Sequence, residues 1–284
     1  NATVKNWPNR YAYVPKGKHN IIFSSNVQNN IPNVSRNYLH YDNLQILSPK
    51  MKLVLDRLMK GKKSLVYSQF RKIEGIGIMK LILEKNGVPN DFKYLAVIES
   101  GLQDVTSPAG AKGFWQIMPA TAKENGLEVN SNVDERYHLE KATQVACNYL
   151  NDAKNRFGNW TMAAAAYNAG NAGISRKIND QKVDDYYDLL LGEETKRYLP
   201  RIVAVKEILS NPDKYGFIFE NEDLYYLEPT RFIEVDTVIT DIALFSKNLG
   251  INYNILKIHN PWLRENKLNN SSRKLYQIKI PSEI

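Results

Sequence analysis

The sequence predicts a mainly α protein that ends in a small β-α-α-β module. Over most of residues 48–210, apolar residues recur at intervals of three and four, which is the period of amphipathic helices. After Pro229 the pattern changes, because two short runs of strand-type residues enclose two short helical runs. With 284 residues, 43% of them hydrophobic, the chain is long enough for one large and one small domain.

Three segments follow from these patterns. Residues 1–45 are polar, rich in Asn and without a sustained period, so we expect an extended N-terminal arm. Residues 46–228 carry the helical patterns of the large domain. The change in pattern and the proline place a boundary near Glu228 and Pro229, so residues 229–284 form the small module.

The large domain begins with helical patterns between Ser48 and Gly87. Their apolar stripes consist of Met51, Val54, Leu55, Leu58 and Met59 and, farther on, of Ile78, Leu81 and Ile82. The next helix is expected over 91–100, with Asn90 or Asp91 as its N-cap and Gly101 as its stop. Four more helices, separated by short loops, are expected over 119–125, 140–157, 160–168 and 194–210.

Cysteine and histidine usage gives no sign of a metal or cofactor. Cys147 lies among apolar residues at helical spacing, so we expect a small core residue. A single cysteine excludes an internal disulfide and a cysteine-based zinc site. The four histidines, His19, His40, His138 and His259, are scattered without metal-ligand spacing.

The small module is expected to contain a strand over 232–235 and a closing strand over 276–280. Between them we expect a helix that Thr240 caps and that ends at Asn248, followed by a second helix over 252–259. The result is a compact β-α-α-β unit.

The net charge of +8 and the pI near 9.2 predict attraction to polyanions without choosing among them. The densest basic cluster, Lys60 to Lys63, lacks the interleaved aromatic residues of single-strand binders, so nucleic acid is not an expected partner. No apolar run approaches the roughly 20 residues of a membrane span.

Glu99 is the candidate catalytic acid. It lies in the last turn of the expected helix 91–100, where the helix dipole disfavours a carboxylate. Desolvation beside Val97 and Ile98 would add to this effect, and both raise the pKa of a carboxylic acid. A glutamic acid of this kind can donate a proton at neutral pH. Taken alone, a glutamate at a helix end is more often a solvated surface residue.

Four sequence blocks give Glu99 a context. They are ESGL at 99–102, SPAGAKGFWQIMPATA at 107–122, AAYNAG at 165–170 and ETKRYLP at 194–200. With these blocks, about residues 75–210 of the sequence resemble the soluble-lytic-transglycosylase superfamily. The joint match in order and spacing is specific, whereas each block alone would be weak.

The resemblance implies a lysozyme-like, α+β catalytic domain that cleaves the glycan strands of peptidoglycan. Glu99 would protonate the glycosidic oxygen between N-acetylmuramic acid (MurNAc) and N-acetylglucosamine (GlcNAc). The same carboxylate would then accept the proton of the muramic C6 hydroxyl, which attacks C1 and closes a 1,6-anhydro ring. No water is consumed, so the enzyme would be a lyase.

The residues themselves point the same way, because ordinary glycosidases use two carboxylates and we find no convincing second one. Asp104 is the nearest acid downstream, and no motif surrounds it. The other acids that follow read as surface charges of helices or turns: Glu124, Glu128, Asp134 and Glu135. A nucleophile held within the bound sugar can replace the second carboxylate. The sequence leaves open whether folding brings a second carboxylate close to Glu99 from a distant position.

The resemblance also assigns a sugar cleft. Its residues beside Glu99 would be Gln116, Met118, Tyr167 and Asn168, with Ser107 near the reacting acetamido group and with Glu194 and Tyr198 from the last block. Tyr198 would hydrogen-bond Glu99 or the reacting sugar and so orient the carboxyl group. Without the motifs, core packing is the simpler interpretation of Met118, Tyr167 and Tyr198.

The small module resembles a degenerate LysM module, which is a peptidoglycan and chitin binder. The similar positions are Ile242, Ala243, Phe245, Ser246, Leu249, Gly250, Ile251, Ile255, Leu256, Asn260 and Pro261. Asp236 to Ile239 replaces the usual Gly-Asp-Thr-Leu segment, and the loop 262–273 is unusual. The fold is therefore expected, while glycan binding by the module is left open.

Two other functions stay under consideration. One is a lysozyme-type hydrolase, which would need a base such as Asp104, and the other is an inactive peptidoglycan-binding scaffold. Glu99 together with Gln116 and Tyr167 argues against inactivity. The substrate places the enzyme outside the cytoplasmic membrane, in the periplasm or at the outer membrane, and the resemblance implies a lipid anchor on the full-length precursor.

Overall fold

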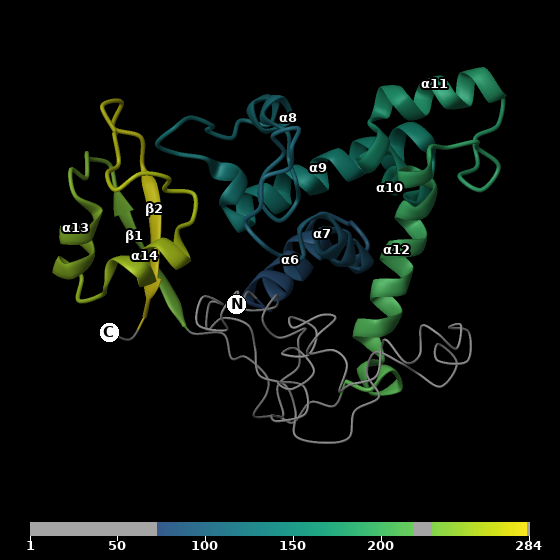
Figure 1. Ribbon diagram of the computed structural model, residues 1–284. Coiled ribbons are helices and arrows are strands. Elements are labelled where there is room, and N and C mark those ends of the chain that lie inside the picture. Colours follow the sequence, from purple (N-terminus) through teal and green to yellow (C-terminus); the bar gives the residue numbers. More distant parts are fainter. Residues whose placement is uncertain (1–72, 218–228, 283–284) are drawn as a thin grey trace, which may run out of the picture. The chain divides into compact units, whose positions relative to one another are not determined.

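The computed structural model describes residues 73–217 and 229–282 of the chain (Figure 1). The predicted arm over 1–45 and the first apolar stripe, from Met51 to Met59, lie outside the described residues. The chain divides into two compact units, one of residues 1–73 and 207–225, the other of residues 74–206 and 226–284. In the described part of the first unit, Glu207 accepts hydrogen bonds from Lys214 (2.7 Å) and Tyr215 (3.2 Å).

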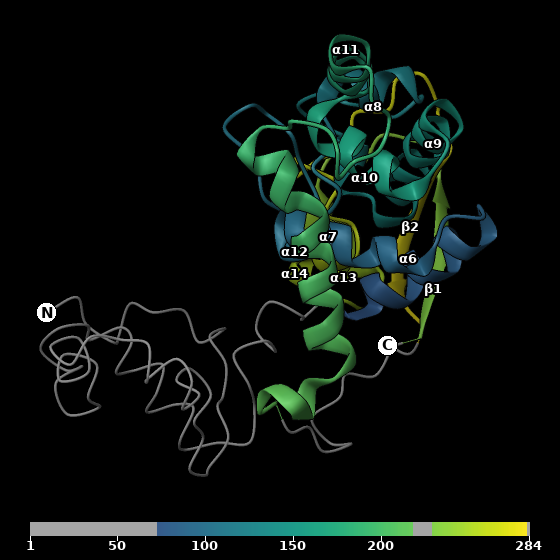
Figure 2. The ribbon, with the colours of Figure 1, turned by 90° about the vertical axis from the view of Figure 1, so that its right-hand side faces the viewer.

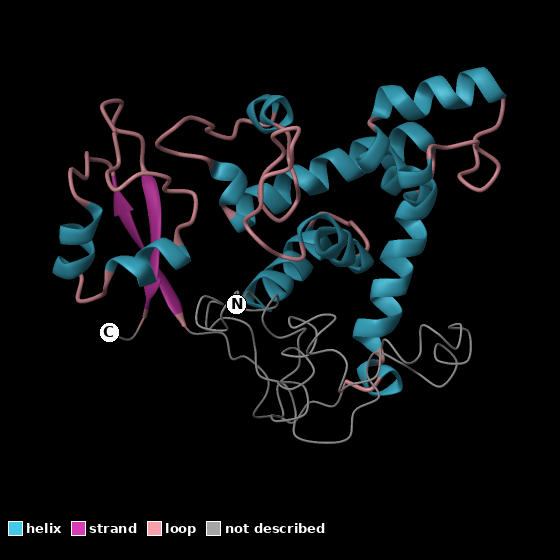
Figure 3. Ribbon diagram, in the orientation of Figure 1, coloured by secondary structure: helices cyan, strands magenta, loops and turns pink. Residues whose placement is uncertain are grey.

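Before Pro229, the described part of the chain consists of helices joined by loops, and its named elements are all helical (Figure 3). Its α-helices are α6 (Ile73–Lys85), α7 (Lys93–Ser100), α8 (Pro119–Glu124), α9 (Leu139–Phe157), α10 (Trp160–Ala169), α11 (Asn171–Gln181) and α12 (Glu193–Ser210). Short 3-10 turns are η3 (Asn90–Phe92), η4 (Glu135–Tyr137) and η5 (Pro212–Tyr215). None of the described helices has the length and apolar character that crossing a membrane requires.

The apolar stripe predicted for α6 is wrong in part. Met79 and Leu83 are fully buried, whereas the side chain of Leu81 is 66% exposed. Apolar residues occur on more than one side of this helix, so their period alone does not select the buried face.

The predicted start of the helix that carries Glu99 is also wrong. Neither Asn90 nor Asp91 caps it, because the chain leaves Pro89 as the 3-10 turn η3 and becomes α-helical at Lys93. The end agrees with the prediction, since Gly101 takes the left-handed conformation with φ 59°.

Helix α11 was not predicted, and a short loop was expected in its place. Few residues of this helix are apolar, and Ile174 is the one that the structure buries. Its period was therefore too weak to detect, and contact with α10 supplies what the local sequence lacks.

The core of the helical part lies around α9 and α10. Trp115 and Cys147 are fully buried, as predicted for Cys147, and the indole of Trp115 donates a hydrogen bond to Oγ1 of Thr143 (2.9 Å). Four consecutive alanines, from Ala163 to Ala166, are buried in α10, and such small side chains let helices approach closely.

Two acids predicted to be surface charges are instead buried. Asp134 and Glu135 are each 2% exposed, and cationic side chains pair with both. Part of what buries them is Trp262 and Lys274, more than 120 positions away along the chain, and local patterns do not show such partners.

The C-terminal module has the predicted β-α-α-β order. It consists of β1 (Thr230–Val235), α13 (Ile242–Asn248), α14 (Tyr253–His259) and β2 (Tyr276–Pro281), and the strands pair antiparallel with Ile233 opposite Ile278. Asp241 caps α13, not Thr240 as predicted: its carboxylate accepts the amides of Ala243 (2.8 Å) and Leu244 (3.1 Å).

Candidate active site

Glu99 stands near the end of α7, beside α12. The two helices lie side by side in both views (Figure 1, Figure 2). The hydroxyl of Tyr198, on α12, donates a hydrogen bond to Oε1 of Glu99, and the Tyr198 side chain is 3% exposed. Arg201, one turn farther along α12, donates to the carbonyl of Ile98 (3.4 Å). The carboxyl group of Glu99 is therefore oriented by a helix that lies about 100 residues away in sequence.

The pKa of Glu99 is raised above its ordinary value. Burial is the largest cause, and the negative charge of Glu194 acts in the same direction. The hydrogen bond from Tyr198 and the positive charge of Arg201 oppose this shift without cancelling it. The structure confirms the direction predicted from the sequence and the role of desolvation.

Tyr167 lies within electrostatic reach of Glu99. Its hydroxyl donates to the carbonyl of Trp115 (2.8 Å), and its ring meets that of Tyr149 edge to face at 5.4 Å. Burial first, and then the charge of Glu99, raise the pKa of Tyr167 well above its ordinary value. The phenol therefore stays neutral beside the carboxyl group.

The third and fourth sequence blocks meet at Asn168. Its amide nitrogen donates to Oε1 of Glu194 (3.4 Å), and its amide oxygen accepts from the hydroxyl of Thr195 (2.7 Å). These contacts connect the end of α10 to the start of α12. The hydrogen bond from Asn168 thereby holds the Glu194 carboxylate, whose negative charge acts on Glu99.

We name residues 105–117 the active-site loop, because it carries Ser107 and Gln116. Oγ of Ser107 accepts the amide of Ala111 (3.0 Å). Gln116 has φ 47°, which is uncommon for a residue other than glycine, and its side chain donates to the carbonyls of Gly113 (2.8 Å) and Val105 (3.2 Å). Both side chains thus shape the loop that carries them.

The loop is joined to the end of α7. Ser100, next to Glu99, donates from its hydroxyl to the carbonyl of Phe114 (2.9 Å). Met118 follows the loop at the N-cap of α8 with its side chain 42% exposed. In the described part of the chain, Ser107, Gln116 and Met118 make no hydrogen bond to Glu99, and their roles toward a sugar stay predictions.

Sequence reasoning missed Arg201 and Thr195. Arg201 lies three positions after Tyr198, so helical spacing could have placed both on one face of α12. Thr195 follows Glu194 in the fourth block, and only the fold shows that it holds Asn168.

The described residues contain one notable cavity, which lies away from the predicted site. Within residues 73–217 and 229–282, no three His, Cys, Asp or Glu side chains gather as a metal site would require. A cavity of about 390 Å³ lies between η4, the start of α9 and the C-terminal module, and its walls include His138, Glu140, Phe232 and Trp262. None of the predicted site residues lines it.

The chain matches two known families. Residues 78–190 match the Transglycosylase SLT domain, and residues 231–284 match the Soluble lytic transglycosylase C-terminal LysM-like domain. Together with the architecture, these matches confirm the predicted fold class in its main features, a mainly helical domain followed by a LysM-like module.

Curated relatives are similar in sequence to this chain over part of their length. Membrane-bound lytic murein transglycosylase D of Escherichia coli (strain K12) is 34% identical over 140 residues, which are 47% of this chain and 31% of that protein. A putative tributyltin chloride resistance protein of Alteromonas sp. (strain M-1) is 31% identical over 102 residues, 35% of this chain and 49% of that protein. The chain therefore spans a third to a half of the length of these relatives.

Two solved structures are similar at lower identity. A complex of the 70-kDa soluble lytic transglycosylase with bulgecin A has a TM-score of 0.44 and 20% identity, covering 71% of this chain and 33% of that one. An inactive mutant of the lytic transglycosylase Slt from Pseudomonas aeruginosa has a TM-score of 0.41 and 16% identity, covering 68% and 31%.

Proposed function

Residues 78–190 are a transglycosylase SLT domain and residues 231–284 a LysM-like domain, and from this premise we propose that the chain is a peptidoglycan lytic transglycosylase. The observation that carries the proposal is the carboxyl group of Glu99, which is partly buried, has a raised pKa and accepts a hydrogen bond from Tyr198. The proposed substrate is the β-1,4 bond from MurNAc to GlcNAc in glycan strands.

In the first step Glu99 acts as an acid. Its raised pKa favours the protonated form, which donates the proton to the glycosidic oxygen as the bond from this oxygen to C1 of MurNAc breaks. GlcNAc leaves with a free C4 hydroxyl. The burial of Glu99 and the charge of Glu194 both support this step, because they disfavour the carboxylate.

In the second step the Glu99 carboxylate acts as a base. It accepts the proton of the C6 hydroxyl of the same MurNAc, whose oxygen forms the new bond to C1 and closes the 1,6-anhydro ring. Tyr198 stabilises the carboxylate by donating a hydrogen bond to it. Opposing influences therefore keep both forms of one residue accessible, and Glu99 ends the cycle protonated.

The remaining site residues are proposed to hold the sugar. Tyr167 and Asn168 come from α10, Glu194 from α12, and Ser107, Gln116 and Met118 from the active-site loop or its end. The net charge of +8 would attract the acidic wall polymer, and salt should weaken this attraction. We place the reaction outside the cytoplasmic membrane, where peptidoglycan lies.

The test is a digest of purified peptidoglycan with the fragments weighed by mass spectrometry. The wild-type protein should release fragments that end in 1,6-anhydro-MurNAc, and Glu99→Gln should release no detectable amount in the same digestion time. The exposed Glu124, changed to Gln in the same way, is the matched control and should cleave like the wild type. Reducing ends would instead show a hydrolase, and no release by the wild type would show a scaffold.

A further inference from the structure

The C-terminal module is packed against the segment 130–137, here named the bridging segment. Two of its side chains, Val133 and Tyr137, are buried in the same hydrophobic cluster as the core of the module. Members of that cluster from the module include Ile242, Leu256, Trp262, Leu263, Leu268, Tyr276 and Ile278. The guanidinium of Arg264 also lies over the ring of Tyr137, 4.1 Å from its centroid. One core therefore spans the module and the bridging segment.

Backbone hydrogen bonds fix the register of this contact. The amide of Asp134 donates to the carbonyl of Trp262 (2.9 Å), and the amide of Arg264 donates to the carbonyl of Asn132 (2.9 Å). Through its side chain, Asn132 donates to the carbonyl of Lys267 (2.8 Å) and accepts the amide of Asn269 (2.8 Å). These partners lie in the loop 262–273, the part of the module that departs from the LysM pattern.

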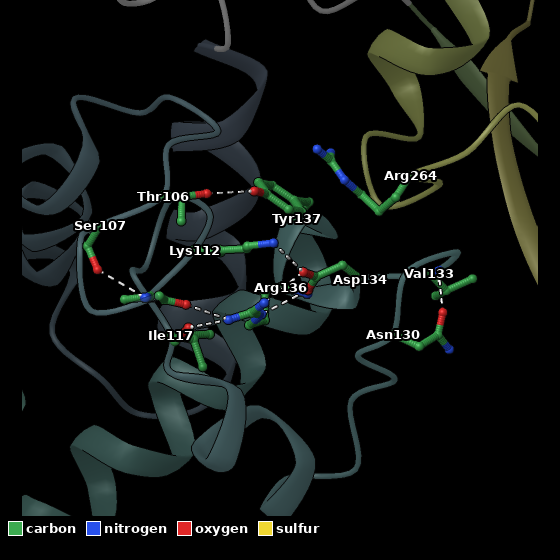
Figure 4. Close-up of polar contacts among 12 residues, drawn as sticks. Thr106, Ser107, Lys112, Ile117, Asn130, Val133, Asp134, Arg136, Tyr137 and Arg264 are labelled. Atoms are coloured by element: carbon green, nitrogen blue, oxygen red, sulfur yellow. Dashed lines mark hydrogen bonds and ion pairs between the residues drawn. The ribbon is translucent and has the colours of Figure 1, made fainter.

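The opposite side of the bridging segment holds the active-site loop (Figure 4). Arg136 is 3% exposed and pairs with both carboxylate oxygens of Asp134, at 2.9 and 2.7 Å. The remaining nitrogen, Nη1, donates to the carbonyls of Gly110 (2.9 Å) and Ile117 (3.3 Å). One guanidinium group thereby joins the middle of the loop to its end.

Two further contacts hold the loop against the same segment. The hydroxyls of Tyr137 and Thr106 lie 3.3 Å apart, which is hydrogen-bonding distance. Gly113 has φ 75°, and a Cβ added there would lie 2.2 Å from the carbonyl oxygen of Arg136. The backbone of the loop thus touches the bridging segment at a point where no side chain fits.

We propose that Arg136 is a positioning residue through which the C-terminal module sets the shape of the active-site loop. The module fixes the bridging segment on one side, and Arg136 fixes the loop on the other. Its planar fork supplies the donors for one carboxylate and two carbonyls at once, which lysine cannot do. The inference rests on the proposed function in one respect, because the loop matters through Ser107 and Gln116.

The first arm of the test measures the loop without any substrate. Hydrogen–deuterium exchange at the amides of Ala111 and Ile117, which donate within the loop, is compared in the whole protein and two variants. Asn132→Ala removes the two side-chain bonds of Asn132 to the module, and Arg136→Lys removes the guanidinium bonds to the loop. Both should accelerate exchange at these amides by about tenfold. Unchanged exchange in the two variants would overturn the proposal.

Asn270→Ala is the matched control. Asn270 is buried like Asn132 and makes the same two bonds, to the carbonyl (2.7 Å) and amide (2.9 Å) of Lys274, but both stay inside the module. Its loss should leave exchange in the loop unchanged. Equal acceleration by Asn270→Ala would mean general destabilisation and would also overturn the proposal.

Tyr137→Phe is a milder variant that keeps the ring in the core, and it tests the proposal even if one of the other variants fails to fold. It removes the hydroxyl that faces Thr106, so exchange at Gly113, whose amide donates to Val105, should rise by about threefold. Exchange at the wild-type rate would count against the proposal.

The second arm measures peptidoglycan cleavage at equal folded fraction, well below the unfolding midpoint. Asn132→Ala and Arg136→Lys should lower kcat by about tenfold, whereas a purely structural role would lower the midpoint and leave kcat unchanged. If the wild type cleaves nothing, the proposed function fails, and the exchange arm still decides whether the module holds the loop.

Discussion

Glu99 and Glu140 are two partly buried glutamates of the same unit whose pKa values are shifted in opposite directions. Burial raises the pKa of both groups. At Glu140 the contacts of His138 and Lys279 outweigh burial and lower the pKa to about 2. At Glu99 the hydrogen bond of a neutral phenol is too weak to do so. The partner, not the degree of burial, decides which carboxyl group is kept ready to carry a proton.

The contrast extends to the whole contact with the C-terminal module. Glu128, Asp134 and Glu135 also have lowered pKa values. Burial raises the pKa of each acid, but hydrogen bonds and the charges of bound lysine or arginine side chains more than offset this effect. In the active site the cation Arg201 acts on Glu99 through its charge, and it donates its hydrogen bond to the carbonyl of Ile98. Glu128, Glu135 and Glu140 pair with lysines of the module, and Asp134 pairs with Arg136. The uncompensated Glu99 is the proposed catalytic acid.

The largest effect is expected from removing the uncompensated acid. Glu99→Gln should lower the rate of glycan cleavage by about 10²- to 10⁴-fold, the usual contribution of a general acid. Because the raised pKa makes ionised Glu99 unfavourable in the fold, the variant should unfold at a higher denaturant concentration at neutral pH than the wild type. This gain should vanish below the ordinary glutamate pKa, and a loss of stability at neutral pH would argue against the comparison.

Breaking the ion pair of a compensated acid should lower the stability of the fold, whereas Glu99→Gln should raise it. Arg136→Ala leaves the buried Asp134 with only the longer ion pair to Lys112 (3.5 Å) and should cost about 3–5 kcal/mol of folding free energy. Urea unfolding at neutral pH measures this loss. Arg273→Ala breaks the exposed pair with Asp236 and should cost about 1 kcal/mol or less. Similar losses in the two variants would show that burial of the pair is irrelevant.

Tyr198→Phe sharpens the comparison at the active site. It removes the hydrogen bond that favours the carboxylate, so the pKa of Glu99 should rise further. The basic limb of the profile of kcat/KM against pH should shift to higher pH, and the rate should fall about tenfold. Tyr149→Phe, whose hydroxyl donates to Ala166, should leave the limb in place. A shift to lower pH in Tyr198→Phe would refute the assigned role.

An effect on stability that depends on pH is expected at Glu140. Because its pKa is lowered to about 2 in the fold, it contributes stability that is present above about pH 4.5 and is lost as pH falls toward 2. Glu140→Gln should therefore cost about 1–3 kcal/mol at neutral pH and nothing near pH 2. Urea unfolding at several pH values measures this difference, and a constant cost at all pH values would contradict it.

The sequence predicted most elements of this fold because their signals are local. Gly101 ends α7 and Asn252 caps α14, each through a residue next to the helix it limits. The errors came where two local signals compete, as at Thr240 and Asp241, or where the local signal is weak, as in α11.

The site was predicted in part, for the same reason. Motif spacing identified Glu99 and Tyr198, which the fold joins by a hydrogen bond. The burial of Asp134 and the contacts of Arg136 depend on the distant module and on the loop geometry, so no neighbouring residue indicates them. Sequence patterns therefore reveal the acid before they reveal what holds its surroundings.

The most direct test is a ¹³C NMR titration of the glutamate carboxyl carbons in the intact protein, with the signals of Glu99 and Glu140 assigned from the two Gln variants. Glu99 should titrate above the ordinary value of 4.5, and Glu140 near 2 in the same sample. A Glu99 signal that titrates at or below 4.5 would contradict the account, because burial would then not keep this carboxyl group protonated for catalysis.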